Sequence, residues 1–231
     1  MKIGKNVAIL SLPSPIKGMP NINPVLTWDD KNLVLIDTGF PKQGKIIAKA
    51  IEAEGLSAEK LTHIIITHQD MDHIGSTLEL QKKAPNVQII AHKEEAPYLD
   101  GRKVPVKLAS MLEKYNNLPL LHKFGCKRAQ KMYRQMQVKF HKELQDKEVL
   151  PICGGIEVVH TPGHTPGHIT LYLHESRIMV CGDGANITDG QLSGPNPTHT
   201  QDMELGMKSL EKIKGYPMVG AVTYHGGYLE I

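Results

Sequence analysis

The sequence has few aromatic residues, few cysteines and no long hydrophobic run. Its 231 residues include one tryptophan, three phenylalanines and three cysteines. The cysteines, Cys126, Cys153 and Cys181, are widely spaced and odd in number, so they suggest neither a disulfide framework nor a CxxC zinc site, and we expect reduced thiols. Ser, Pro and Lys interrupt the short apolar run near the start before it could form a signal-peptide core or a membrane span. These absences predict a cytoplasmic protein with no membrane span.

A strong excess of charge is also lacking. The net charge is +3, and 22% charged with 40% hydrophobic residues is ordinary for a folded globular protein. Residues 101–148 nevertheless hold 12 Lys or Arg and 4 acidic residues, a local charge of +8. Aromatic and basic residues do not interleave as in a nucleic-acid stacking surface. We expect a small-molecule substrate and no nucleic-acid partner, while the oligomeric state stays open, with a homodimer as one alternative.

Predicted strands and helices are mixed from one end of the chain to the other. β-branched and apolar runs predict strands over residues 7–12, 25–28, 33–37, 62–67, 87–91, 156–160, 169–173, 177–181 and 218–223. Apolar residues at helical spacing predict a helix that follows Pro41 and ends before Gly55, and further helices over 74–83 and 203–213. The pattern indicates one α/β domain over residues 1–231.

Residues 95–148 differ from the rest and predict a helical insertion. Lys127, Lys131 and Arg134 lie opposite an apolar stripe with a period near four. Such a stripe is more typical of plain core than of a substrate pocket, and a basic face is more typical of solvated surface. The residues of the stripe are Phe124, Met132, Tyr133, Met136, Phe140 and Leu144.

Four side chains that can bind metal lie close together after one predicted strand. His68, Asp70, Asp72 and His73 fall within six residues, directly beyond strand 62–67 and before a predicted helix. Alternate residues of an extended chain point the same way, so His68 and Asp70 can face one ion. Asp72 and His73, where the loop turns, can face a neighbouring ion. This density predicts two adjacent metal ions on a loop between strand and helix.

Three further candidates each follow another predicted strand. His164 lies in a loop rich in proline and glycine, whereas Asp183 and His225 are each followed by glycine. Such residues fix tight turns that can aim a side chain inward. His160 and His168 flank His164 and could either orient the site through hydrogen bonds or simply pack. The remaining isolated histidines are assigned no role.

In order and context these segments resemble the motifs of the metallo-β-lactamase superfamily. The family signature runs His-x-His-x-Asp-His, then a TPGH-type His, a bridging Asp and a C-terminal His. The resemblance extends from Asp37 to His225 and leaves mainly the insertion unmatched. Asp37 matches an Asp turn behind the metals and is expected to tune either that turn or a ligating histidine. It implies a four-layer α, β, β, α sandwich, two mixed sheets covered by helices, with metal at one edge. The implied ligands are His68, Asp70 and His164 for the first metal, Asp72, His73 and His225 for the second, and Asp183 bridging both.

One position departs from the family signature, because its second histidine is Asp70 here. Two divalent ions and three carboxylates carry a net charge of +1, or zero once hydroxide binds. A histidine at position 70 would leave one more positive charge. A less positive site weakens Lewis acidity, and the harder oxygen ligand makes iron or manganese more plausible than usual. Zinc remains the first choice for the two divalent ions. Asp70 could also be a nearby residue that does not bind metal.

The resemblance implies a dinuclear metal-dependent hydrolase. A bridging hydroxide would attack a lactone, ester, thioester or β-lactam-like carbonyl, and Asp72 or Asp183 would transfer the proton. Small lactonases and glyoxalase II-like enzymes are the closest in general form, although residues 184–200 lack the tyrosine common in homoserine lactonases. Three alternatives stay open: a di-iron redox enzyme related to flavodiiron proteins, a phosphodiesterase, and a non-catalytic metal- or ligand-binding module. Since this family often builds a substrate lid where residues 95–148 lie, Met132, Tyr133 and Met136 are candidates to line the substrate.

Overall fold

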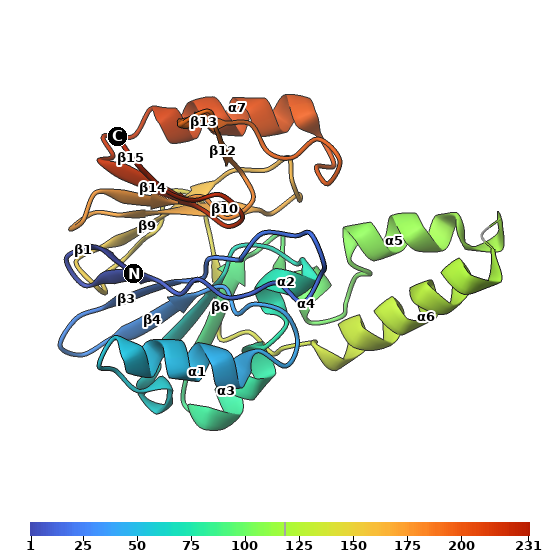
Figure 1. Ribbon diagram of the computed structural model, residues 1–231, viewed down its shortest axis with the longest axis horizontal. Helices are drawn as coiled ribbons and strands as arrows, with labels where there is room; N and C mark the ends of the chain where they lie inside the picture. The colour runs from blue at the N-terminus through green and yellow to red at the C-terminus, as the bar shows by residue number, and fades with distance from the viewer. Residues whose placement is uncertain (118) are drawn as a thin grey trace.

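Two β-sheets face each other, and helices cover their outer faces (Figure 1). The computed structural model describes residues 1–117 and 119–231. Helices α1 (Gly44–Ala53) and α3 (Thr77–Lys83), with the short η1 (Ala58–Lys60), cover the first sheet, and α7 (Met203–Lys214) covers the second. The predicted four-layer sandwich is therefore confirmed.

The first sheet has seven strands in sequence order. It is antiparallel from its first to its fourth strand and parallel from the fourth to the seventh, so it is mixed. Its strands are β1 (Lys2–Gly4), β2 (Val7–Ile9), β3 (Val25–Trp28), β4 (Leu33–Ile36), β5 (His63–Ile66), β6 (Gln88–His92) and β7 (Lys142–Leu144).

The second sheet has six strands and is also mixed, because one of its pairs, β11 with β14, is parallel. The strands, in spatial order, are β15 (Gly227–Glu230), β14 (Gly220–Thr223), β11 (Ile178–Val180), β10 (Ile169–Leu173), β9 (Ile156–His160) and β8 (Val149–Leu150). A separate hairpin pairs β12 (Asn186–Thr188) with β13 (Gln191–Ser193).

Alternation along the central strands divides the core into layers. In β4, Val34 and Ile36 belong to the cluster between the two sheets, whereas Leu35 belongs to the cluster under the helices. In β5, Ile65 faces the inner cluster and its neighbours face the helices. A strand that is buried on both faces reads as a continuous apolar run, and this explains why β5 was predictable from sequence.

The predicted helix over 74–83 is wrong in one respect, because the structure has two helices there. α2 (Met71–Ile74) ends before Gly75, and α3 begins at Thr77. Gly75 contacts the loop at Pro41 so closely that a Cβ would overlap the Pro41 nitrogen. Asp72 and His73 consequently lie on the short helix α2 and not on a loop. The strand predicted last is also not the last, since β15 follows it.

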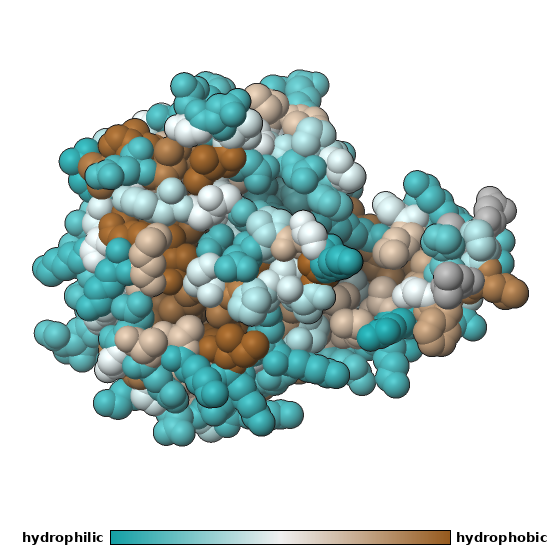
Figure 2. Space-filling view, viewed as in Figure 1, coloured by the Kyte–Doolittle hydropathy of each residue, from teal (hydrophilic) through white to brown (hydrophobic). Residues whose placement is uncertain are grey.

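The predicted insertion projects from the sandwich through two helices that form an arm, with apolar and polar residues mixed on the surface of the arm (Figures 1 and 2), whereas its residues 142–144 form β7 of the first sheet. It contains α4 (Ala96–Leu99), α5 (Val106–Glu113), η2 (Tyr115–Asn117) and α6 (Leu120–Gln135). The predicted stripe is wrong at both ends, because Phe124 is 67% exposed and Leu144 belongs to β7. Met136 is core, and Met132 and Tyr133 pack against it, which favours the plain-core alternative. Within the described ranges, no helix has the length and apolar character needed to cross a membrane.

Candidate metal centre

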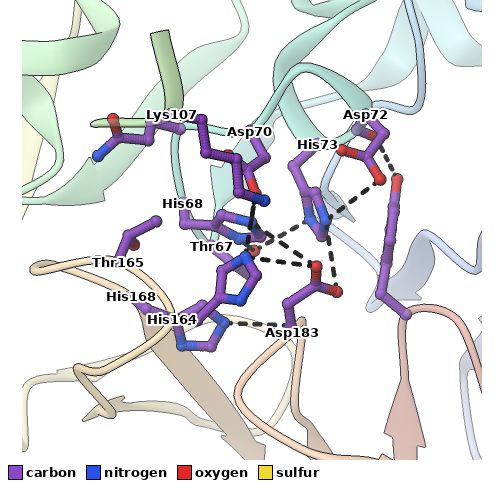
Figure 3. Close-up of polar contacts among 12 residues, drawn as sticks. Thr67, His68, Asp70, Asp72, His73, Lys107, His164, Thr165, His168 and Asp183 are labelled. Atoms are coloured by element: carbon purple, nitrogen blue, oxygen red, sulfur yellow. Dashed lines mark hydrogen bonds and ion pairs between the residues drawn. The ribbon is translucent and has the colours of Figure 1, made fainter. Parts of the chain in front are cut away.

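The predicted ligands meet at one edge of the sandwich, where several strands end. Figure 3 labels all of them except His225. His68 and Asp70 come directly after β5, Asp183 after β11 and His225 after β14. His164 comes from the loop between β9 and β10. Side chains separated by up to 157 positions in sequence thus share one site because their strands point to the same edge.

The ligand-capable atoms form two groups, and the division is the one predicted from the sequence. In the first group, Asp70 Oδ2 lies 3.2 Å from His68 Nε2 and 3.0 Å from His164 Nε2. In the second group, Asp72 Oδ2 lies 3.8 Å from His73 Nε2 and 3.4 Å from His225 Nε2. Within each group the candidate atoms lie no more than 4.8 Å apart.

Asp183 lies between the two groups and faces both of them. Its Oδ2 is 3.5 Å from His164 Nε2 and 4.0 Å from His68 Nε2. Its Oδ1 is 3.6 Å from His73 Nε2 and 3.5 Å from His225 Nε2. A carboxylate that offers one oxygen to each group has the arrangement needed to bridge two cations.

Unpartnered histidine nitrogen atoms indicate that the residues fit divalent metal. The buried atoms His68 Nε2 and His73 Nε2 have no hydrogen-bond partner among the described residues. Buried polar atoms are normally hydrogen-bonded, so such orphans facing carboxylates are typical of metal ligands. Metal ligation by the seven residues stays a prediction, which this donor set supports.

Asp37 orients His73 from behind, as expected from the sequence. Its Oδ2 accepts a 2.8 Å hydrogen bond from His73 Nδ1, and its Oδ1 accepts one of 2.9 Å from the Thr67 backbone N–H. Asp37 has a positive φ of 63°, so the turn after β4 is strained in order to hold this carboxylate. With Nδ1 engaged, Nε2 of His73 is the atom left for a metal.

His168 orients the loop that carries Asp183. Its Nε2 accepts a 3.2 Å hydrogen bond from the Asp183 backbone N–H, and its Nδ1 lies 2.9 Å from Thr161 Oγ1. Gly182, at φ 52°, leaves room for this ring, because a Cβ there would lie 2.9 Å from His168 Nε2. His160 Nε2 bonds the Pro166 carbonyl at 3.0 Å. Both flanking histidines therefore hold the ligand loops, the first of the two alternatives.

The electrostatics of the site favour ionised carboxylates beside histidines. Burial lowers the pKa of His68 to about 4. Burial also acts to lower the pKa of His73, but the charges of Asp37, Asp183 and Asp72 outweigh it and raise the pKa well above its usual value. For Asp183, burial acts to raise the pKa, and the neighbouring His73 instead holds it well below the ordinary range. Such carboxylates stay deprotonated at neutral pH, which is the form that binds metal.

Three residues at the site were missed by the sequence reasoning. Tyr224 stacks on His73 with ring centroids 3.8 Å apart, and its hydroxyl donates a 2.6 Å hydrogen bond to the Asp72 carbonyl. The Lys107 ammonium lies against Asp70, and the fully buried Glu95 bonds the loops on both sides of the site. Each contact joins residues that are far apart in sequence, so no local pattern could have revealed it.

A third set of ligand-capable side chains, His92, Glu94 and His160, lies outside this site. The two histidine rings stack with centroids 4.2 Å apart and planes only 18° apart. Lone pairs of imidazole lie in the ring plane, so nearly parallel stacked rings do not aim them at one point. We therefore do not interpret this set as a second metal site.

A cavity of about 280 Å³ opens directly onto the two groups. Its wall includes Lys107, Asn186, Asn196 and His199 from outside the predicted ligand set, together with Met19 and Pro20. The sequence alone assigns no role to His199. The cavity approaches the size of ordinary small-molecule pockets.

The four-layer sandwich and the paired His/Asp groups at its edge are shared with a known superfamily. The model of the metallo-β-lactamase superfamily matches residues 19–218, and the chain belongs to this superfamily. The probable metallo-hydrolase YflN of Bacillus subtilis (strain 168) is 27% identical over 87% of this chain and 78% of its own length. Because the chain belongs to this superfamily and its relatives include hydrolases, it is a metal-dependent hydrolase.

Two other relatives are named for specific reactions. The hydroxyacylglutathione hydrolase GloC of Haemophilus influenzae is 29% identical over 68% of this chain and 64% of its own length. An N-acyl homoserine lactonase of Bacillus sp is 24% identical over 78% of this chain and 70% of its own. Among solved structures, a metallo-β-lactamase family protein of Thermus thermophilus has a TM-score of 0.74 at 19% identity, covering 97% of this chain and 75% of that one. At that identity the likeness shows the fold alone.

Proposed function

We propose that this protein is a dinuclear hydrolase that cleaves an activated carbonyl compound: a lactone, ester, thioester or β-lactam-like substrate. The observation that carries the proposal is Asp183, which turns one carboxylate oxygen toward each ligand group at the cavity floor. Zinc is the proposed metal, because histidine nitrogen and carboxylate oxygen are its ordinary ligands. A single domain over residues 1–231, with 95–148 as an insertion or lid, and a cytoplasmic location also stay predictions.

The metal ions, when bound, would lower the pKa of a water molecule and polarise the oxygen under attack. His68, Asp70 and His164 would hold one ion, and Asp72, His73 and His225 the other. Asp72 and Asp183 line the cavity beside these groups, so either carboxylate can take a proton from the attacking water and return it to the leaving group.

The cavity wall supports a small substrate that carries a polarised oxygen. Asn186, Asn196 and His199 line the cavity, and each side chain can donate a hydrogen bond. Met19 and Pro20 add an apolar edge against which a short carbon chain can pack. The names of the relatives, a hydroxyacylglutathione hydrolase and a lactonase, support the same class of carbonyl substrate.

A second candidate function, redox chemistry at two iron ions, is favoured by the place of Asp70 among the ligands. A third carboxylate is a harder ligand than histidine and suits iron. Metal analysis of protein purified without added metal separates the two candidates. Two irons per chain with visible absorption indicate the redox enzyme, whereas two colourless zinc ions indicate the hydrolase.

The test is a panel of chromogenic lactone, thioester, β-lactam and phosphodiester substrates. Metal-free protein is reloaded with zinc, manganese or iron and assayed on each. We expect turnover of a carbonyl substrate that depends on added metal, lost in His225→Ala and kept in the control His122→Ala, whose ring is exposed on α6. Turnover of the phosphodiester alone would replace the carbonyl class, and turnover of no substrate would point to the binding module.

A further inference from the structure

The insertion delivers one basic side chain to the candidate metal centre. Lys107 is the second residue of α5, and its Nζ contacts Asp70 Oδ2, an atom of the first ligand group (Figure 3). Asp70 is 4% exposed, and the side chain of Lys107 is 37% exposed at the cavity. The one ligand position that departs from the family signature is therefore also the one that a lysine contacts.

A chain of buried and partly buried hydrogen bonds fixes the start of α5 against the ligand loop. The backbone N–H of Val106 donates a 2.7 Å bond to Gln69 Oε1, and Gln69 Nε2 donates a 2.9 Å bond to Glu95 Oε2. Glu95 Oε1 in turn accepts bonds from Thr165 Oγ1 at 2.5 Å and from the Gly167 N–H at 2.9 Å. Gln69 lies between His68 and Asp70 in sequence, so this relay ties Lys107 to the loop that holds the first group.

The charges explain what a lysine does there. A histidine ligand is neutral, and Asp70 adds a negative charge that the signature histidine would not. One lysine beside that carboxylate cancels the difference, so that two divalent ions, three carboxylates and Lys107 together carry +2. A signature site with a neutral histidine and two carboxylates carries the same +2.

We propose that Lys107 is a positioning residue of the metal centre that compensates the charge of Asp70 and is held in place by the Gln69–Glu95 relay. The inference rests on the proposed pair of metal ions. It makes the insertion a functional part of the metal centre, beyond any role as a lid. Without the Lys107 ammonium the net charge of the metal centre is +1, and with histidine in place of Asp70 it is +3. With both changes the net charge is again +2.

The test measures the affinity of metal-free protein for zinc by competition with a chromogenic chelator at fixed ionic strength. Lys107→Met removes a cation that repels the bound ions, so we expect its zinc dissociation constant to fall roughly tenfold. Asp70→His should bind more weakly than wild type, and Asp70→His with Lys107→Met should recover affinity toward the wild-type value. Lys107→Arg should match wild type, because the charge is kept.

Lys114→Met is the matched control, since it removes an exposed lysine of the same insertion and changes the net charge equally. A damaged fold would weaken metal binding, so tighter binding in Lys107→Met identifies a charge effect. If Lys107→Met and Lys114→Met both bind zinc as wild type does, the compensation is refuted while the proposed function stands. If wild-type protein itself binds no metal pair, the proposed function fails and this inference fails with it.

Discussion

The hydrogen bonds that connect Glu95, Gln69 and Val106 predict how Val106→Pro changes the free energy of unfolding. The sign of that change depends on which way the Gln69 amide is turned. Three donors surround the Glu95 carboxylate, and its two oxygens accept all three hydrogen bonds. In Glu95→Gln the new amide must keep its oxygen toward Thr165 and Gly167 and turn its NH₂ toward Gln69. Gln69 then flips to accept that bond, and its own NH₂ faces the Val106 N–H. Two buried donors oppose each other, which costs about 1–3 kcal/mol.

Val106→Pro removes the opposing N–H donor. Val106 is the first residue of α5, where proline is well accepted, and Pro105 before it has ψ 140°, as a residue preceding proline requires. In the wild-type background this substitution loses the bond to Gln69 and should destabilise the fold by about 1 kcal/mol. In the Glu95→Gln background it should stabilise the fold by about 1–2 kcal/mol, because the donor clash disappears.

The assay is urea unfolding of the four proteins without metal at pH 8. Burial raises the pKa of Glu95 to about 7, so at pH 8 the carboxylate is mostly ionised. Loss of this buried charge also affects Glu95→Gln, and the double-mutant cycle cancels that contribution. Each kcal/mol corresponds to about 2–4 °C in melting temperature for a chain of this size. If Val106→Pro costs the same in both backgrounds within about 0.5 kcal/mol, the relay as described is refuted.

Three further predictions follow from the site and its surroundings. Asp37→Asn should weaken zinc binding by about 10- to 100-fold, because it loosens His73, and an unchanged dissociation constant would count against this role. Loading metal-free protein with zinc at 1,000 times its dissociation constant should stabilise the fold by about 4 kcal/mol for each bound ion and raise the melting temperature by roughly 10 °C per ion, and a chelator should reverse this shift. Burial lowers the pKa of His92 from 6.5 to about 4, so the unfolded chain takes up a proton below about pH 6.5 and the folded chain does not. As the pH falls from 6.5 to 4, the free energy of unfolding should therefore decrease by about 1–3 kcal/mol more in wild type than in His92→Phe. Phenylalanine is chosen because its ring can keep the stack on His160, and parallel pH curves for the two proteins would contradict this prediction.

The candidate ligands could be predicted because their signals are local. His68, Asp70, Asp72 and His73 follow one buried strand within six residues, and strand ends are where sites form in α/β proteins. Strands β3, β9 and β10 were predicted with their observed bounds, since each is an apolar run enclosed by turns. Here the residue types, their spacing and the fold agree.

The remaining features depend on contacts between distant segments. The break between α2 and α3 falls where Gly75 lies close to Pro41, and nothing in residues 74–83 alone indicates it. Edge strands of three residues, such as β7, have too few positions to show alternation. Lys107 reads as one more lysine of a basic insertion, and only its contact with Asp70 separates it from its neighbours.

The most direct test of the central claim is a zinc titration of metal-free wild-type protein and of Asp183→Ala, with the exposed Asp30→Ala as control. Asp183 turns one oxygen toward each ligand group, so wild type and the control should each bind two equivalents tightly and hydrolyse a carbonyl substrate. Asp183→Ala should lose tight binding of the pair together with activity. An Asp183→Ala protein that still holds two zinc ions and keeps full activity would contradict the account.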